Sequence, residues 1–166
     1  MALWSTAEVA RQLVRITAAL HAEYGGRKIA PQNQHITVVF LGEVGVDRVA
    51  EVQRAMQAAA GTPFELTLDK VEYRKRGGML WARAMQVPDA LSLLVNRLRT
   101  ALIELGFTVE DRAFVPHVTL LRDARKPLQS AALNARWRVE ELTLVRSHLD
   151  RHGARYEVIC RVPLAD

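Results

Sequence analysis

The chain has 166 residues, enough for one ordinary domain or for two small lobes that share a core. Its 49% apolar and 25% charged residues are typical of a soluble globular protein and exclude a disordered tail, a coiled coil and a collagen-like repeat. The formal charge is +5 and all but four of the 23 basic residues are arginines, which indicates either a phosphate-bearing partner or a GC-rich genome.

The first 61 residues predict a helix, a strand and a second helix. Ser5 to Glu8 has the form of a capping box, and Gly25-Gly26 closes the helix that follows it. The strand runs from His35 to Leu41, and the second helix runs from Asp47 to Ala60 with Gly61 as its stop. The apolar stripes of the two helices are Val9, Leu13, Ile16 and Leu20, and then Val49, Val52 and Met56.

The next segment predicts a hairpin followed by a third helix. Strands Phe64 to Tyr73 and Met79 to Met85 flank a basic turn, Arg74 to Gly78, which we interpret as solvent-exposed; contact with an RNA backbone is the alternative. The third helix opens at Pro88-Asp89 and ends at Gly106. Its apolar stripe consists of Leu91, Leu94, Val95, Leu98 and Leu102.

The last third of the chain predicts strands Phe114 to Leu121, Trp137 to Arg146 and Ala154 to Val162, with a turn at Arg151-His152-Gly153. No Ser/Gly/Pro-rich linker divides the chain, so we expect a single α+β domain with interleaved elements. A strand that opens with His-x-Thr, a second strand and a basic hairpin follow one another twice, which suggests a duplicated β-rich unit.

The cysteine content, the absence of metal-binding motifs and the hydropathy of the chain exclude several other classes of protein. The single Cys160 excludes an intramolecular disulfide and a multi-cysteine metal site, and its apolar surroundings predict a packing role. There is no His-Glu-x-x-His motif and no tight acidic cluster, so we expect neither zinc nor magnesium. The start of the chain does not resemble a signal peptide and no apolar run is long enough for a bilayer, so we expect a cytoplasmic protein.

Two His-x-Thr motifs carry the chemistry. His35 and Thr37 form one and His117 and Thr119 the other, whereas chance predicts fewer than one such triplet in this composition. Residues i and i+2 of a strand share a face, so each pair projects together. Two imidazoles can divide the roles of general base and general acid, and two hydroxyls can donate to phosphate oxygens. The alternative for either motif alone is polar surface on a half-buried strand.

The remaining histidines are weaker candidates. His21 lies late on the first predicted helix, and His148 and His152 lie near the second hairpin, so we expect solvated positions for all three.

The sequence around the two motifs resembles the 2H phosphoesterase superfamily. Residues 34–44 (QHITVVFLGEV) and 111–123 (DRAFVPHVTLLRD) are similar to its two signatures. Their flanks, and residues 144–147 and 154–157, resemble the RNA 2′,3′-cyclic phosphodiesterase family, also called 2′-5′ RNA ligase. The resemblance implies two pseudo-symmetric α+β lobes of antiparallel sheet and helices on either side of a central cleft.

The resemblance also implies an activity and roles for individual residues. The implied reaction opens a 2′,3′-cyclic phosphate on RNA or a nucleotide to a 2′-phosphomonoester without metal or cofactor, and its reverse joins RNA halves, such as tRNA halves, through a 2′-5′ linkage. His117 would activate water, His35 would protonate the departing 3′ oxygen, and the two threonines would hold the phosphate. Phe40 would stack on a base, with core packing as the alternative. Arg122 would clamp phosphate, with a surface charge as the alternative.

Phe40 and Arg122 each lie five residues after a catalytic histidine, which is the wrong parity for one face of a regular strand, so a strand end or a bulge is required. The chain also departs from the family at its start, where Met1 to Trp4 are all that resembles an apolar first strand. We therefore predict one bilobal domain over residues 1–166 with a shortened first strand, acting as a monomer.

Two other functions remain open. One is a 2H phosphoesterase acting on a different cyclic phosphate or on a 2′-5′ oligonucleotide, for which the same four residues would serve. The other is a non-catalytic RNA-binding module, which would not need a pair of histidines.

Overall fold

The computed structural model describes residues 1–127, 131–150 and 153–165. The elements follow in the order β1 (Ala2–Trp4), α1 (Ala7–Tyr24), β2 (Arg27–Lys28), a 3-10 turn (Pro31–Asn33), β3 (His35–Thr37), a second 3-10 turn (Val46–Arg48), α2 (Val49–Ala59), β4 (Phe64–Arg74), β5 (Met79–Arg83), α3 (Asp89–Glu104), β6 (His117–Arg122), β7 (Ala132–Val139), β8 (Glu141–Asp150) and β9 (Gly153–Pro163).

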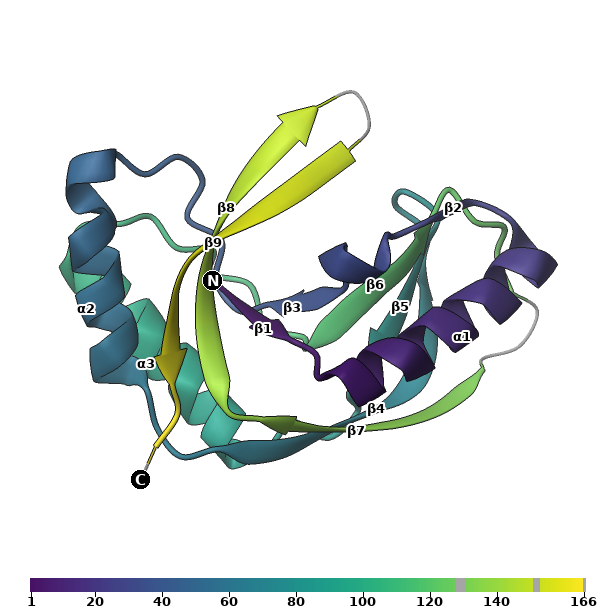
Figure 1. Ribbon diagram of the computed structural model, residues 1–166, viewed down its shortest axis with the longest axis horizontal. Coiled ribbons are helices and arrows are strands. Elements are labelled where there is room, and N and C mark those ends of the chain that lie inside the picture. Colours follow the sequence, from purple (N-terminus) through teal and green to yellow (C-terminus); the bar gives the residue numbers. More distant parts are fainter. Residues whose placement is uncertain (128–130, 151–152, 166) are drawn as a thin grey trace.

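The strands of the described residues form one antiparallel sheet in the order β7-β4-β5-β6-β3-β1-β8-β9, and β2 pairs beside it with β6. Each histidine motif opens one of the two central strands, β3 and β6, where the two halves of the sheet meet. In Figure 1, α2 and α3 lie on one side of the molecule and α1 on the other, with β1, β3 and β6 between them. The predicted α+β fold with antiparallel sheet is confirmed.

The three helices follow the predicted apolar stripes. In α3 the five buried residues are the five predicted ones, and α1 buries Val9, Leu13 and Leu20. The N-cap of α1 is one residue later than the capping-box prediction, because the Thr6 hydroxyl accepts the Val9 amide at 3.4 Å. Asp47 and Arg48, expected at the start of the second helix, belong instead to a separate 3-10 turn over Val46–Arg48.

The helices cover different parts of the sheet. Helix α1 packs on β6 and β7, while α2 packs on α3 and reaches β9. Fully buried side chains from helices and strands, including Leu13, Leu66, Leu98, Leu120 and Trp137, form one continuous core. Removal of this apolar area from water stabilises the sheet that carries both histidine motifs.

The strand expected from Phe114 begins only at His117, and the strand expected to reach Met85 ends at Arg83. Two other strand predictions were wrong by more. The strand expected over His35 to Leu41 ends at Thr37, because the amides of Val38 and Val39 both turn toward the Met1 carbonyl. The run from Trp137 to Arg146 is two strands, because the chain leaves β4, its partner in β7, and pairs with β1 and β9 as β8.

Both predicted hairpins are present as paired strands. In the β4–β5 hairpin, Gly77 and Gly78 have φ of 74° and 50°, and a Cβ at Gly78 would lie 2.9 Å from the Ala124 carbonyl oxygen. Glycine is therefore required in this turn. The β8–β9 hairpin projects away from the rest of the molecule (Figure 1), and its predicted tip residues Arg151 and His152 lie outside the described residues.

Strand β1 occupies an interior position in the sheet. It pairs with β3 over three residues, including Trp4 opposite His35, and with β8 through Ala2 and Thr143. The sheet is therefore continuous across β1; that this strand is shorter than in relatives stays a prediction. Over the described part of the chain, no helix has the length and apolar character needed to cross a membrane.

Candidate active site

The pairing of β3 with β6 brings the two histidine motifs together. Ile36 lies opposite Val118, and both side chains are fully buried. Their neighbours in each strand must therefore project from the opposite face of the sheet. In this antiparallel register, His35 and Thr119 lie across from each other, as do Thr37 and His117. Four polar side chains thus share one face, as the sequence predicted.

His35 is held on three sides. Its Nδ1 donates to the Asn33 carbonyl at 2.8 Å, so Nε2 carries no hydrogen and accepts a hydrogen bond from the Thr37 hydroxyl at 3.2 Å. The imidazole stacks on the Trp4 indole, with ring centroids 4.6 Å apart, and meets the edge of the Tyr156 ring at 4.7 Å. Its orientation and tautomer are therefore fixed before any substrate binds.

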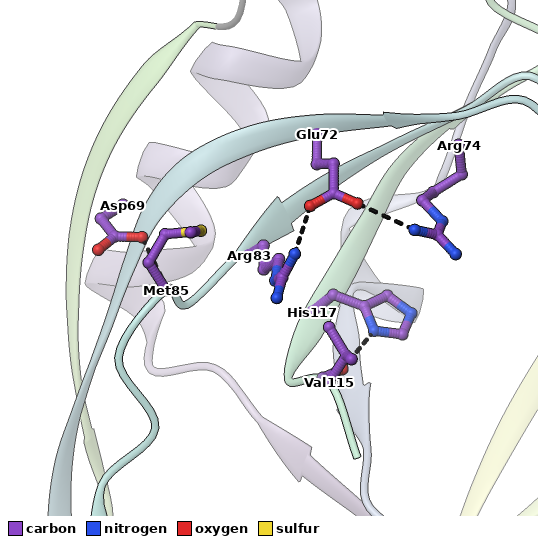
Figure 2. Close-up of polar contacts among 7 residues, drawn as sticks. All are labelled: Asp69, Glu72, Arg74, Arg83, Met85, Val115 and His117. Carbon is purple, nitrogen blue, oxygen red and sulfur yellow. Dashed lines mark hydrogen bonds and ion pairs between the residues drawn. The ribbon is translucent and has the colours of Figure 1, made fainter. Parts of the chain in front are cut away.

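His117 has a matching environment on the other strand. Its Nδ1 donates to the Val115 carbonyl at 2.7 Å (Figure 2), and its ring stacks on Trp81 with centroids 3.6 Å apart. Each histidine is thus anchored through Nδ1 to the carbonyl two residues before it and lies against a tryptophan. This is the common geometry of the two motifs, and it leaves Nε2 of each ring available for proton transfer.

Partial burial favours the neutral form of both rings. Burial lowers the pKa of His35 to about 4. The hydrogen bond to Asn33 raises this pKa, but by less than burial lowers it. Burial also lowers the pKa of His117; Arg112 and Arg74 lower it further, while Glu72 raises it. The neutral form of both imidazoles is therefore favoured in the free protein.

Phe40 and Arg122 lie on the site's side of the sheet because the strand alternation is interrupted in both motifs. After each threonine, two consecutive residues are buried: Val38 and Val39 in one motif, Leu120 and Leu121 in the other. In β6 the extra residue is a β-bulge against β5, and in the first motif the strand has already ended. The residue five places after each histidine is thereby returned to the face that carries that histidine.

A groove of about 850 Å³ opens beside His35. His35, Thr37, Phe40 and Arg122 line it, together with residues of β8 and β9. Phe40 is 69% exposed, so the alternative that it fills the core is wrong. His117 and Thr119 do not line this groove; they lie next to it through the β3–β6 pairing.

Sequence reasoning missed the aromatic supports and a charged cluster. Trp4, Trp81 and Tyr156 come from strands β1, β5 and β9, which no sequence spacing connects to the motifs. Glu72 binds Arg74 and Arg83 on β4 and β5 (Figure 2). Strand alternation in the predicted hairpin fixes the face of the sheet that Trp81 occupies, but not the strand that pairs beside it.

The other histidines lie apart from this arrangement. His148 is exposed and lies 3.0 Å from Glu157 on the β8–β9 hairpin, as expected of a solvated position. His21 is partly buried on α1, and His152 lies outside the described residues. Within residues 1–127, 131–150 and 153–165, no three His, Cys, Asp or Glu side chains gather as metal ligands would.

Comparison with known proteins places the chain in a family. Residues 3–151 match the model of the 2′-5′ RNA ligase superfamily. The chain belongs to this superfamily. It is 34% identical to the RNA 2′,3′-cyclic phosphodiesterase of Escherichia coli K12 over 161 residues, which cover 93% of this chain and 89% of that protein. The family resemblance inferred from the two motifs is confirmed.

Solved structures of similar proteins superpose on nearly the whole chain. The crystal structure of E. coli LigT in apo form superposes with a TM-score of 0.90 at 32% identity, covering 99% of this chain and 95% of that one. A Thermus thermophilus protein, TT0787, superposes with a TM-score of 0.85 at 27% identity, covering 98% and 95%. E. coli LigT has also been crystallised with 3′-AMP.

Proposed function

We propose that this protein is an RNA 2′,3′-cyclic phosphodiesterase that opens the cyclic phosphate at an RNA or nucleotide end to a 2′-phosphomonoester. The observation that carries the proposal is the facing pair of His-x-Thr motifs on β3 and β6, each with its histidine anchored through Nδ1 to a backbone carbonyl. The names of its relatives and the 3′-AMP complex of E. coli LigT support a nucleotide substrate. Since one chain supplies both motifs, we propose that the single bilobal domain works as a monomer.

The proposed reaction is an in-line displacement at phosphorus. His117 Nε2 takes a proton from water as its oxygen attacks phosphorus, and the bond from phosphorus to the 3′ oxygen breaks. His35 gives a proton to that departing oxygen. Thr37 and Thr119 donate hydrogen bonds to the non-bridging oxygens, on which negative charge accumulates in the transition state.

A non-catalytic RNA-binding role is less well supported. Binding needs cationic and aromatic side chains, but it does not need two imidazoles with matched anchoring and tautomer. The decisive assay is turnover of a nucleoside 2′,3′-cyclic phosphate with and without EDTA. We expect hydrolysis at the same rate in both. Salt-dependent RNA binding without turnover of any cyclic phosphate would contradict the proposal, and loss of turnover in EDTA would contradict its metal independence.

The pH dependence should differ between kcat/KM and kcat. The productive form has one neutral and one charged imidazole, and kcat/KM reports the free protein. Because burial lowers the pKa of His35 to about 4 and the pKa of His117 below its usual 6.5, that form is most abundant at acidic pH. We expect kcat/KM to peak below pH 6.5 and to fall about tenfold per pH unit on its alkaline side.

The negative charge of bound phosphate favours the charged imidazole and so raises its pKa. The optimum of kcat should therefore lie at a higher pH than that of kcat/KM. Initial rates between pH 4 and 9, at substrate concentrations below and above KM, measure both profiles. A flat profile, or a kcat optimum more acidic than that of kcat/KM, would show that the two imidazoles do not carry the proton transfers.

Phe40 should contribute to substrate affinity. Its exposed ring lines the groove beside His35, where a terminal base can stack on it for about 1–3 kcal/mol. We expect Phe40→Ala to raise KM for a cyclic mononucleotide about 5- to 150-fold with little change in kcat, and Phe40→Trp to restore KM. Val46→Ala is the matched control, because Val46 is as exposed and lies outside the groove. A KM for Phe40→Ala within twofold of wild type refutes stacking.

A further inference from the structure

A charged cluster lies beside His117 on the sheet face that carries the histidines. Glu72 on β4 accepts hydrogen bonds from Arg74 at 3.0 Å and from Arg83 on β5 at 2.5 Å, one guanidinium on each carboxylate oxygen. Figure 2 shows Glu72 between the two arginines, with the His117 ring nearby. The proposed hydrolysis of a cyclic phosphate assigns this cluster no role.

The cluster is continuous with the proposed catalytic site. Arg83 lies directly opposite His117 in the β5–β6 register. The Arg74 guanidinium lies 4.9 Å from the centre of the Trp81 ring, and this ring stacks on His117. An anion bound by these arginines would therefore be a close neighbour of a phosphate bound between the histidines.

The two guanidinium groups retain unused positive charge and donors. Glu72 neutralises only one of the two charges, and each guanidinium has five N–H donors. In both arginines the hydrogen bond to Glu72 comes from Nη1. The Arg74 side chain is 51% exposed and that of Arg83 29%, so both can be reached from solvent. An ion pair as exposed as that of Arg74 adds little to stability, so anion binding explains the position of Arg74 better.

Other basic residues of the hairpin do not share this arrangement. Lys75 and Arg76 lie in the exposed turn between β4 and β5, as expected for a solvated tip. Arg74, from the same basic run, instead folds back over Trp81 toward the site. The structure thus separates one residue of the basic turn from the other two.

We propose that Arg74 and Arg83, held by Glu72, form a second anion subsite that binds a phosphodiester of the RNA chain upstream of its cyclic end. This inference rests on the proposed function and specifies its substrate as an oligonucleotide. A cyclic mononucleotide has one phosphate, which the His-x-Thr motifs would occupy, so only a longer chain can fill the second subsite. Guanidinium donors pair well with the two free oxygens of a phosphodiester.

The test compares adenosine 2′,3′-cyclic phosphate with the dinucleotide ApA with a 2′,3′-cyclic end, which adds one upstream adenosine and its phosphodiester. We expect wild type to prefer the dinucleotide about tenfold in kcat/KM, and Arg74→Gln and Arg83→Gln each to reduce that preference to about twofold. The salt dependence of kcat/KM for the dinucleotide should also weaken in both variants. Thermal unfolding checks that the variants are folded.

Arg138→Gln is the matched control. Arg138 also binds two carboxylates, Glu65 and Glu140, but lies on β7. It should keep the preference of wild type. A wild-type ratio near one, or an equal loss on both substrates in the two variants, overturns the subsite, the latter because the arginines would then act through His117. If neither substrate is opened by wild type, the proposed function itself fails and the subsite with it.

Discussion

Replacement of either His35 or His117 by alanine should lower kcat/KM for a nucleoside 2′,3′-cyclic phosphate by about 10²–10⁴. Each imidazole is oriented through its Nδ1 so that Nε2 can exchange the proton, and the threonine beside it in the same motif is too weak an acid or base to replace it. Since the two transfers belong to one displacement, the double variant should be only slightly slower than the slower single variant.

Folding should survive these changes. Both rings are only partly buried and lie on the open face of the sheet, while Ile36 and Val118 supply the core contacts of the same strands. The measurement is initial rate together with thermal unfolding. His148→Ala is the control, because His148 is exposed and pairs with Glu157 on the hairpin. A folded His35→Ala or His117→Ala variant with wild-type turnover would disprove the paired-imidazole mechanism.

Loss of the threonine hydroxyls should have the next largest effect. Thr37→Val and Thr119→Val keep the shape and strand preference of the side chain but remove the donor aimed at the phosphate. Removal of one such donor typically costs 10²–10³ in rate, so we expect kcat to fall by about this factor in each variant. Thr37 also lies 3.2 Å from His35 Nε2, so its loss should affect both phosphate binding and the histidine.

Serine variants provide the matched comparison. Thr37→Ser and Thr119→Ser retain the hydroxyl and should keep kcat within about tenfold of wild type, because only a methyl group is lost. Steady-state kinetics on all four variants separate the hydroxyl from the rest of the side chain. If valine and serine variants behave alike, the hydroxyls do not stabilise the transition state.

Local sequence patterns were sufficient to predict those helices and strands whose start and stop signals lie in their own sequence. Helix α3 has a five-residue apolar stripe and a closing glycine, and the structure buries those five residues. The ends of a strand could not be predicted where hydrogen bonds to a segment distant in the sequence determine them. The end of β3 is determined by hydrogen bonds from Val38 and Val39 to Met1, and the break between β7 and β8 by a change of pairing strand.

For Phe40 and Arg122, the sequence predicted that the strand alternation must be interrupted, but not whether by a bulge or by a strand end. Their parity required a break in the strand, and the sequence contains its signal: two adjacent aliphatic residues after each His-x-Thr triplet. An alternating strand buries every second residue, so two successive buried positions imply a bulge or a strand end. The structure has a bulge in β6 and a strand end after β3.

The aromatic supports could not be predicted. Trp4 and Trp81 reach the histidines through pairing of β1 with β3 and of β5 with β6, and such long-range pairings are not encoded in local periodicity. The arginine excess is likewise only partly explained. Arg122 lines the groove and Arg74 and Arg83 flank His117, whereas others, such as Arg48 with Glu51, form surface ion pairs.

In the proposed mechanism, two facing His-x-Thr motifs open a 2′,3′-cyclic phosphate by releasing its 3′ oxygen. The most direct test of this mechanism is product analysis after incubation of wild type, His35→Ala and His117→Ala with adenosine 2′,3′-cyclic phosphate. We predict adenosine 2′-phosphate from wild type and almost none from either variant. Formation of the 3′-phosphate by wild type, or of the 2′-phosphate at the same rate by the variants, would contradict the account.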